Sequence, residues 1–204
     1  MTRIIAGAAG GRRLAVPAGR STRPTSDRAR EGLFSGVLAM LGTLDGAAVL
    51  DLYAGSGAVG LEALSRGATD VVLIESDDTA AQVIRRNIEA VGLPGARLVR
   101  DRVARALRRG PPAPTRPRDL VFADPPYSAA DDEISEVLAA LAEHGWLASD
   151  ALVIIERDAR SGPPPWPVGY THDRSRRYGE TVLWYGRAAG PAPARSEETA
   201  PTGA

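Results

Sequence analysis

The sequence contains no cysteine and no lysine, and its only histidines are His144 and His172. Without cysteine, neither a disulfide nor a thiolate metal site can form. Two histidines are too few for a histidine-rich metal centre, so we expect no bound metal. No apolar run approaches the roughly 18 residues that a membrane-spanning helix requires, and the N-terminus lacks the apolar core of a signal peptide. We therefore expect a cytoplasmic protein with no contact with a membrane.

The charges balance over the whole chain but not locally. The 204 residues include 25 basic and 25 acidic side chains, and every basic one is an arginine. With 44% hydrophobic residues, the composition is that of a soluble globular protein with one ordinary domain. Seven arginines but a single acid, Asp27, lie in residues 1–30. This basic end indicates contact with a polyanion, although a flexible, solvated arm would have the same composition.

From residue 47 onward, apolar strands alternate with helices. We expect strands at residues 48–52, 71–75, 97–99, 120–123 and 152–156, and helices up to residue 66 and over residues 77–91, 103–109 and 134–144. Continuous apolar strands that alternate with helices are typical of a parallel sheet covered on both faces. The pattern therefore predicts an α/β fold.

The two ends of the chain differ from this pattern. Short strands within residues 3–7 and 12–16 are expected to form a loose hairpin, and a helix is expected to begin near Thr25 or Ser26. Residues 171–178 and 181–187 are predicted to pair antiparallel. From residue 190 onward the composition is typical of a disordered segment.

An acid and two prolines end the apolar stretch Val121-Phe122-Ala123-Asp124-Pro125-Pro126-Tyr127. Neither proline can continue a central strand, because its φ is fixed and it has no N–H. The sequence predicts a strand that stops at Ala123 or Asp124, followed by a rigid turn at the carboxyl edge of the sheet. Ligands bind at that edge in open α/β sheets, although an ordinary turn would also use aspartate and proline.

The segment Gly55-Ser56-Gly57-Ala58-Val59-Gly60 matches the G-x-G-x-x-G pattern of dinucleotide sites. Asp51, four residues before the first glycine, would repel a pyrophosphate and attract a cationic ligand. S-adenosylmethionine (SAM) carries a sulfonium and an α-ammonium and no phosphate. Glu75 is expected to accept hydrogen bonds from ribose hydroxyls, and Asp101 from the adenine amine. Structural roles also remain open for these acids. Asp51 could be a helix-cap partner, Glu75 a solvated strand end and Asp101 an N-cap.

With SAM as methyl donor, the residues after the fourth strand acquire a chemical role. The Asp124 carboxylate and the Pro125 carbonyl can accept the two hydrogens of an exocyclic amine and aim its lone pair at the methyl group. Tyr127 offers a flat face on which the base can stack. The candidate catalytic residues are Asp124, Pro125, Pro126 and Tyr127.

These motifs resemble those of the class I SAM-dependent methyltransferases with an (Asp/Asn)-Pro-Pro-(Tyr/Phe) motif, and most closely the bacterial 16S rRNA guanine-N2 methyltransferases. The likeness covers residues 3–187. It is carried by Arg-Pro-Thr-Ser-Asp-Arg-Ala-Arg-Glu-Gly-Leu-Phe at residues 23–34, by residues 51–66, by Asp124 to Tyr127, by Gly145-Trp146-Leu147 and by the strand that ends at Glu156.

The resemblance implies a Rossmann-like, seven-stranded, mostly parallel sheet with helices on both faces. We divide the chain into an N-terminal hairpin extension (residues 1–25), which the resemblance implies helps to hold RNA, a methyltransferase domain (26–187) and, from its composition, a disordered tail (188–204). The implied substrate is the N2 amine of a guanine in 16S rRNA, within the assembled or partly assembled 30S subunit, and we expect a monomer. The expected cofactor-binding residues are Asp51, Tyr53, Ala54, Gly55, Ser56, Gly57, Glu75, Ser76, Asp101 and Arg102. The expected RNA-binding residues are Arg12, Arg13, Arg20, Arg23, Thr25 and Arg28.

Three alternatives stay open at this stage. The catalytic tetrapeptide also occurs in DNA adenine-N6 and protein-glutamine methyltransferases, although we expect no second domain that could read DNA sequence. A non-catalytic RNA-binding module would keep the fold without the activity. The complete set of acids, glycine turn and catalytic tetrapeptide argues against this alternative. An NAD-binding oxidoreductase is the third alternative, and only the glycine pattern supports it.

Overall fold

The computed structural model describes residues 2–17, 27–114 and 116–189. Predictions for Arg20, Arg23, Thr25, the start of the first helix and the tail from residue 190 lie outside these ranges. Two short strands, β1 (Thr2–Arg3) and β2 (Arg13–Leu14), form the N-terminal hairpin. The main sheet contains β3 (Ala48–Leu52), β4 (Asp70–Glu75), β5 (Ala96–Arg100), β6 (Arg118–Ala123), β7 (Leu147–Asp158), β8 (Tyr170–Tyr178) and β9 (Thr181–Ala188). The helices are α1 (Asp27–Leu41), α2 (Ala58–Ser65), α3 (Asp78–Val91), α4 (Val103–Arg108) and α5 (Asp131–Glu143).

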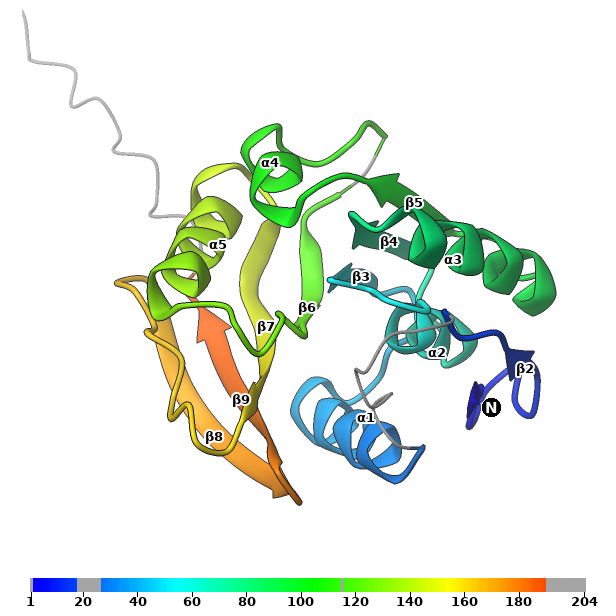
Figure 1. Cartoon of the computed structure of the whole chain (residues 1–204), viewed down its shortest axis with the longest axis horizontal. Helices are drawn as coiled ribbons and strands as arrows, with labels where there is room; N and C mark the ends of the chain where they lie inside the picture. The colour runs from blue at the N-terminus through cyan, green and yellow to red at the C-terminus, as the bar shows by residue number, and fades with distance from the viewer. Residues whose placement is uncertain (1, 18–26, 115, 190–204) are drawn as a thin grey trace, which may run out of the picture.

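The seven main strands lie in the order β5-β4-β3-β6-β7-β9-β8 (Figure 1). Strands β3 to β7 pair in parallel, and β9 pairs antiparallel with both β7 and β8. After β3, the chain adds β4 and then β5 on one side of β3. It then crosses back and adds β6 on the other side of β3. Ligands bind at such a reversal of strand order, beyond the carboxyl ends of the strands. The predicted seven-stranded, mostly parallel fold is confirmed.

Alternate side chains of the parallel strands enter two different cores. Val49, Leu73 and Phe122 belong to a buried cluster with α1, α2 and α3, whereas the neighbouring Leu50 and Val121 belong to a second cluster with α4 and α5. Figure 1 shows α4 and α5 on one side of the central strands and α1 and α2 on the other. All five residues of β3 are buried. This two-sided burial explains why the strands read as continuous apolar runs.

Two elements begin three or more residues before their predicted bounds. Helix α5 begins at Asp131 rather than at Ile134, because three acids occupy its first turn, where they interact favourably with the helix dipole. Strand β7 begins at Leu147 rather than at residue 152, before the apolar stretch that signalled it. Within the described ranges, no helix combines the length and the apolar character needed to cross a membrane.

The N-terminal hairpin is shorter than predicted, because a buried acid on α2 takes its backbone donors. Glu62, which is fully buried, accepts hydrogen bonds from the backbone N–H of Ile5 at 2.7 Å and of Ala6 at 3.0 Å. Three residues on, Ser65 accepts from Ala9 N–H at 2.9 Å and donates to the Ala6 carbonyl at 2.6 Å. These contacts fix the extension against α2, the helix that follows the glycine turn.

Candidate active site

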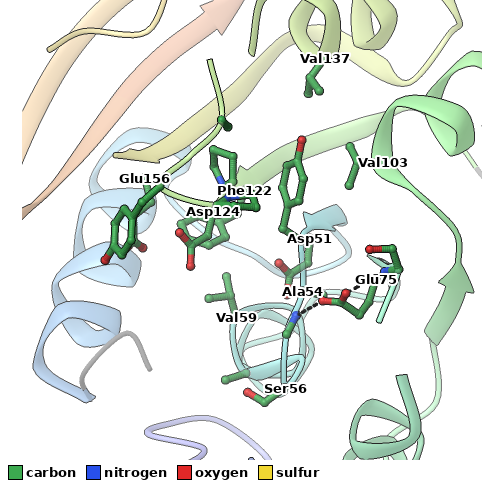
Figure 2. Close-up of a pocket in the computed structure, with 18 of the residues that line it drawn as sticks. Asp51, Ala54, Ser56, Val59, Glu75, Val103, Phe122, Asp124, Val137 and Glu156 are labelled. Carbon is green, nitrogen blue, oxygen red and sulfur yellow. Dashed lines mark hydrogen bonds between the residues drawn. The ribbon is translucent and has the colours of Figure 1, made fainter. Parts of the chain in front are cut away.

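Four acidic side chains, one from each of four adjacent parallel strands, line a single cavity of about 660 Å³. They are Glu75 at the end of β4, Asp51 in β3, Asp124 just after β6 and Glu156 in β7. In Figure 2 their labels follow one another across the cavity in the order of the strands, from Glu156 on the left through Asp124 and Asp51 to Glu75 on the right. We call these residues the acidic row.

The register of the sheet explains this alignment. Leu52 of β3 pairs with Ile74 of β4 and with Ala123 of β6, and Ala123 pairs with Ile155 of β7. The next residue in each of β4, β6 and β7 is an acid of the row, so these three acids lie at the same level. Asp51 lies one pleat lower on the same face, because it precedes Leu52. All four carboxylates therefore project to the α1 side of the sheet.

Asp51 is buried within this arrangement. Its carboxylate accepts a hydrogen bond from Gly60 N–H at 2.8 Å, which ties the strand to the first turn of α2. Burial raises the pKa of Asp51 to about 8; the hydrogen bond from Gly60 opposes this rise, and the charges of Asp124 and Glu75 add to it. A cationic ligand near Asp51 would favour the charged carboxylate.

Glu75 fixes the glycine turn that precedes α2. One of its oxygens accepts from Gly55 N–H at 2.9 Å, and the other accepts from the N–H groups of Ser76 at 2.7 Å and Asp77 at 2.8 Å. The predicted ribose acceptor thus lines the cavity and also holds its wall in place.

The turn itself requires unusual backbone conformations. Tyr53 has a φ of 60°, Gly55 of 58° and Gly57 of 76°. A Cβ at Gly57 would meet a methyl group of Leu73 at 3.0 Å, so only glycine fits there. Asn87 of α3 donates to the Ser56 carbonyl at 2.8 Å. Of the predicted turn residues, Tyr53, Ala54, Gly55 and Ser56 line the cavity, and Gly57 does not.

Asp101 lies outside the cavity wall, whereas its neighbour Arg102 and also Ser76 line it. The Asp101 side chain is ion-paired with Arg109 at 2.8 Å and with Arg105, and it accepts from Arg102 N–H at 2.7 Å. Burial acts to raise the pKa of Asp101, but these hydrogen bonds and charges lower it on balance. In this structure Asp101 holds α4 in place. It is not the N-cap of α4, a role that falls to Arg102 without a side-chain hydrogen bond.

The four candidate catalytic residues all line the cavity. Strand β6 ends at Ala123, as predicted, and Asp124 N–H reaches back to the Leu52 carbonyl at 3.4 Å. Pro125 is buried, whereas Tyr127 is 64% exposed. Partial burial, followed by the charges of Asp124 and Glu156, raises the pKa of Tyr127. The corner therefore combines a fixed carboxylate with a ring that presents most of its surface to solvent.

The predicted RNA-binding arginines that the structure describes are exposed, and one of them is hydrogen-bonded to a helix end. Arg12 donates to the carbonyls of Ala90, at 2.8 Å, and Val91, so its charge stabilises the C-terminal end of α3. Arg13 and Arg28 are exposed on the hairpin and on the first turn of α1.

Several cavity residues were not among the predicted site residues. Arg30, only 1% exposed, lines the cavity and donates to Thr2 Oγ1 at 2.9 Å and to Asp27 at 3.0 Å. Its position within residues 23–34, which carry the family likeness, was the available signal. Glu156 ends an apolar run with an acid, as Glu75 does, and that shared pattern could have identified it. Further lining residues come from the hairpin extension, α4 and α5, namely Val16, Pro17, Val103, Ala104, Glu133, Glu136 and Val137.

Comparison with known proteins gives one consistent family. Residues 2–187 match the family described as "Conserved hypothetical protein 95". The chain is 36% identical to "Ribosomal RNA small subunit methyltransferase D" of Escherichia coli (strain K12), over 88% of this chain and 86% of that protein. It is 34% identical to "Putative rRNA methyltransferase YlbH" of Bacillus subtilis (strain 168), over 88% of this chain and 95% of that protein.

Solved structures agree with these matches. "Putative methyltransferase yhhF from Escherichia coli" is 34% identical with a TM-score of 0.78, covering 93% of this chain and 99% of that one. A Thermus structure, "hypothetical protein TTHA0928", is 31% identical with a TM-score of 0.71, covering 91% of this chain and 98% of that one. The predicted resemblance to small-subunit rRNA methyltransferases is confirmed. The chain belongs to the Conserved hypothetical protein 95 family, and its fold is that of the class I SAM-dependent methyltransferases.

Proposed function

We propose that this protein transfers a methyl group from SAM to the exocyclic N2 amine of a guanine in 16S rRNA. The cofactor is SAM, and the relatives are rRNA methyltransferases by name. The observation that carries the proposal is the position of Asp124 at the carboxyl end of β6, next to β3 and its glycine turn, within one cavity.

The charges that line the cavity suit SAM better than a dinucleotide. Among the described residues, six carboxyl groups face two arginines there, Arg30 and Arg102; the acids are Asp51, Glu75, Asp124, Glu133, Glu136 and Glu156. Even when Asp51 is protonated, the other five acids outnumber the two arginines, so a pyrophosphate would be repelled, whereas a sulfonium and an ammonium would be attracted. We therefore favour SAM, held by Asp51, Glu75 and the backbone of the glycine turn, over NAD.

When bound, SAM supplies an electrophilic methyl group. The Asp124 carboxylate and the Pro125 carbonyl each accept one hydrogen of the target amine, which turns the nitrogen lone pair away from the ring and toward the donor. Transfer would break the bond between the methyl group and the sulfonium, leaving a neutral thioether, as the nitrogen bonds to the methyl group. The charge of Asp124 would stabilise the positive charge on the amine, and its carboxylate would accept the released proton. Tyr127 stacks on the base once it has left its helix or loop.

The raised pKa of Asp51 predicts that SAM binding depends on pH. Below about pH 8 the buried carboxyl group of the free protein is protonated. A cationic ligand favours the ionised form, so binding releases a proton, and affinity should rise by up to about tenfold per pH unit from pH 6.5 toward pH 8 before it levels off. Calorimetry at pH 7 in two buffers of different ionisation enthalpy measures the released proton. Asp51→Asn should remove both the proton release and the pH dependence, and a flat profile for the unmodified protein would refute this assignment.

For the substrate, we propose the assembled or partly assembled 30S subunit, bound by a monomer of the protein. The arginine-rich first 30 residues support a polyanionic partner, and the name of the E. coli relative specifies the small subunit.

The test uses methyl-labelled SAM with three acceptors, namely 30S subunits that lack the modification, free 16S rRNA and DNA. We expect label in the 30S subunits, in the RNA rather than in the proteins, and none in DNA. Label in DNA or in ribosomal protein, or none in any acceptor, would contradict the proposal.

A further inference from the structure

We propose that Glu156 selects guanine by accepting a hydrogen bond from the ring N1–H of the base whose exocyclic amine Asp124 holds. This inference rests on the proposed function and adds to it the residue that identifies the base.

The sheet places these two carboxylates side by side. Ala123 pairs with Ile155, so the next residues, Asp124 just after β6 and Glu156 in β7, also lie side by side, with Cα atoms about 5 Å apart. Both side chains project to the α1 face, because Phe122 and Ile154, two residues earlier, belong to the same buried cluster. Both line the cavity, and only 6% of Glu156 is exposed. Figure 2 shows them as neighbours at one end of the cavity.

Glu156 lies on the side of Asp124 that is remote from the cofactor wall. Strand β7 is three strands from β4, which carries Glu75. Adjacent strands are about 4.8 Å apart, so the two acids are separated by roughly 14 Å. Glu75 and the glycine turn hold SAM at one end, and Asp124 lies between them and Glu156. The carboxylate of Glu156 is therefore placed to meet the acceptor base.

The charge environment of Tyr127 supports the same placement. The charges of Asp124 and Glu156 both act on its hydroxyl group, so both carboxylates lie near the ring that we expect to stack on the base. A base stacked on this ring would therefore lie beside the two acids.

Guanine matches a pair of acceptors at this edge. Its N1–H and its N2 amine are adjacent donors, and an ionised carboxylate accepts but cannot donate. Adenine, held by its N6 amine, would present the lone pair of N1 to Glu156, and the two acceptors would repel each other. A hydrogen bond to a charged group is worth enough to favour guanine about 10- to 100-fold.

The test compares two bases that share the reacting amine. 30S subunits are reconstituted from 16S rRNA that carries either guanine or 2-aminopurine at the methylated position. 2-Aminopurine keeps the 2-amino group, but its N1 bears a lone pair instead of a hydrogen. We expect the wild-type protein to favour guanine in kcat/KM. In Glu156→Gln the carbonyl oxygen can still accept from guanine N1–H but has lost its charge, so the guanine reaction should fall by about 10-fold. The amide N–H can donate to the N1 lone pair of 2-aminopurine, so the 2-aminopurine reaction should rise.

The decisive quantity is the change in the guanine to 2-aminopurine ratio between variants, because the absence of O6 in 2-aminopurine affects all variants alike. Glu136→Gln, which removes a charge from α5 at the same cavity, is the matched control and should keep the wild-type ratio even if both rates change. SAM binding by calorimetry reports whether each variant is folded. If Glu156→Gln does not fold, Glu156→Ala, with neither donor nor acceptor, should lower the ratio as well.

An equal ratio in the wild-type protein and a folded Glu156 variant would overturn this inference alone. Failure of the wild-type protein to methylate guanine in the 30S subunit would overturn the proposed function and this inference with it.

Discussion

Asp124→Ala is expected to lower the rate of methyl transfer by on the order of 1,000-fold, with little change in SAM affinity. The variant loses the acceptor that orients the amine, the charge that stabilises the developing cation and the proton acceptor, all from one side chain. Asp124 follows β6, while the turn that we assign to SAM follows β3. Single-turnover transfer to 30S subunits and calorimetric SAM binding measure the two quantities separately.

Two further variants sharpen this result. Asp124→Asn keeps an oxygen acceptor and loses the charge, so its rate should lie between those of the wild-type protein and Asp124→Ala. Asp132→Ala, which removes an exposed acid from the first turn of α5, should react at nearly the wild-type rate. If Asp124→Ala transferred methyl groups within tenfold of the wild-type rate, the proposed chemistry at this corner would be wrong.

Glu62→Ala is expected to lower the free energy of unfolding by about 3–5 kcal/mol, a large share of the stability of an ordinary domain. Glu62 is ion-paired with Arg66 at 2.8 Å and lies 3.7 Å from Arg30, which is itself buried. Its removal leaves the charge of Arg30 with less compensation, and it deprives the N–H groups of Ile5 and Ala6 of their acceptor. Urea unfolding measures the loss.

The matched control is Glu89→Ala, which removes an exposed acid from α3. Its free energy of unfolding should change by no more than about 0.5 kcal/mol. Limited proteolysis of Glu62→Ala should cleave first within residues 2–17, because the hairpin extension loses its main anchor. A loss of stability below 1 kcal/mol would mean that the contacts of Ser65 and the apolar core hold the extension without Glu62.

The parallel strands could be predicted because their signal is local. A strand buried on both faces is apolar throughout, as Ala48–Leu52 is, and a proline pair marks its end, as after Ala123. The bounds of the hairpin extension were harder to predict, because its backbone N–H groups donate to Glu62 and Ser65, which lie more than 50 residues away in the sequence. Periodicity carries no information about such contacts.

The same distinction applies to the candidate site. Asp51, Glu75 and Asp124 could be recognised from their places next to strand ends and glycines. The acidic row as a set could not be predicted. The sequence shows that Glu156 ends an apolar run, but not that β7 pairs with β6 in the register that places Glu156 beside Asp124. Asp101 was expected to face the cofactor, but Arg105, one helical turn later, pairs with it. That spacing of four residues was a local signal for a structural role.

The most direct test of the central claim is the identity of the nucleoside that carries the label after reaction with unmodified 30S subunits. Digestion of the labelled RNA, followed by chromatography and mass analysis, should yield N2-methylguanosine as the labelled product. N6-methyladenosine, or label on a ring nitrogen or on ribose, would contradict the account, because the Asp124 corner would then hold a different group.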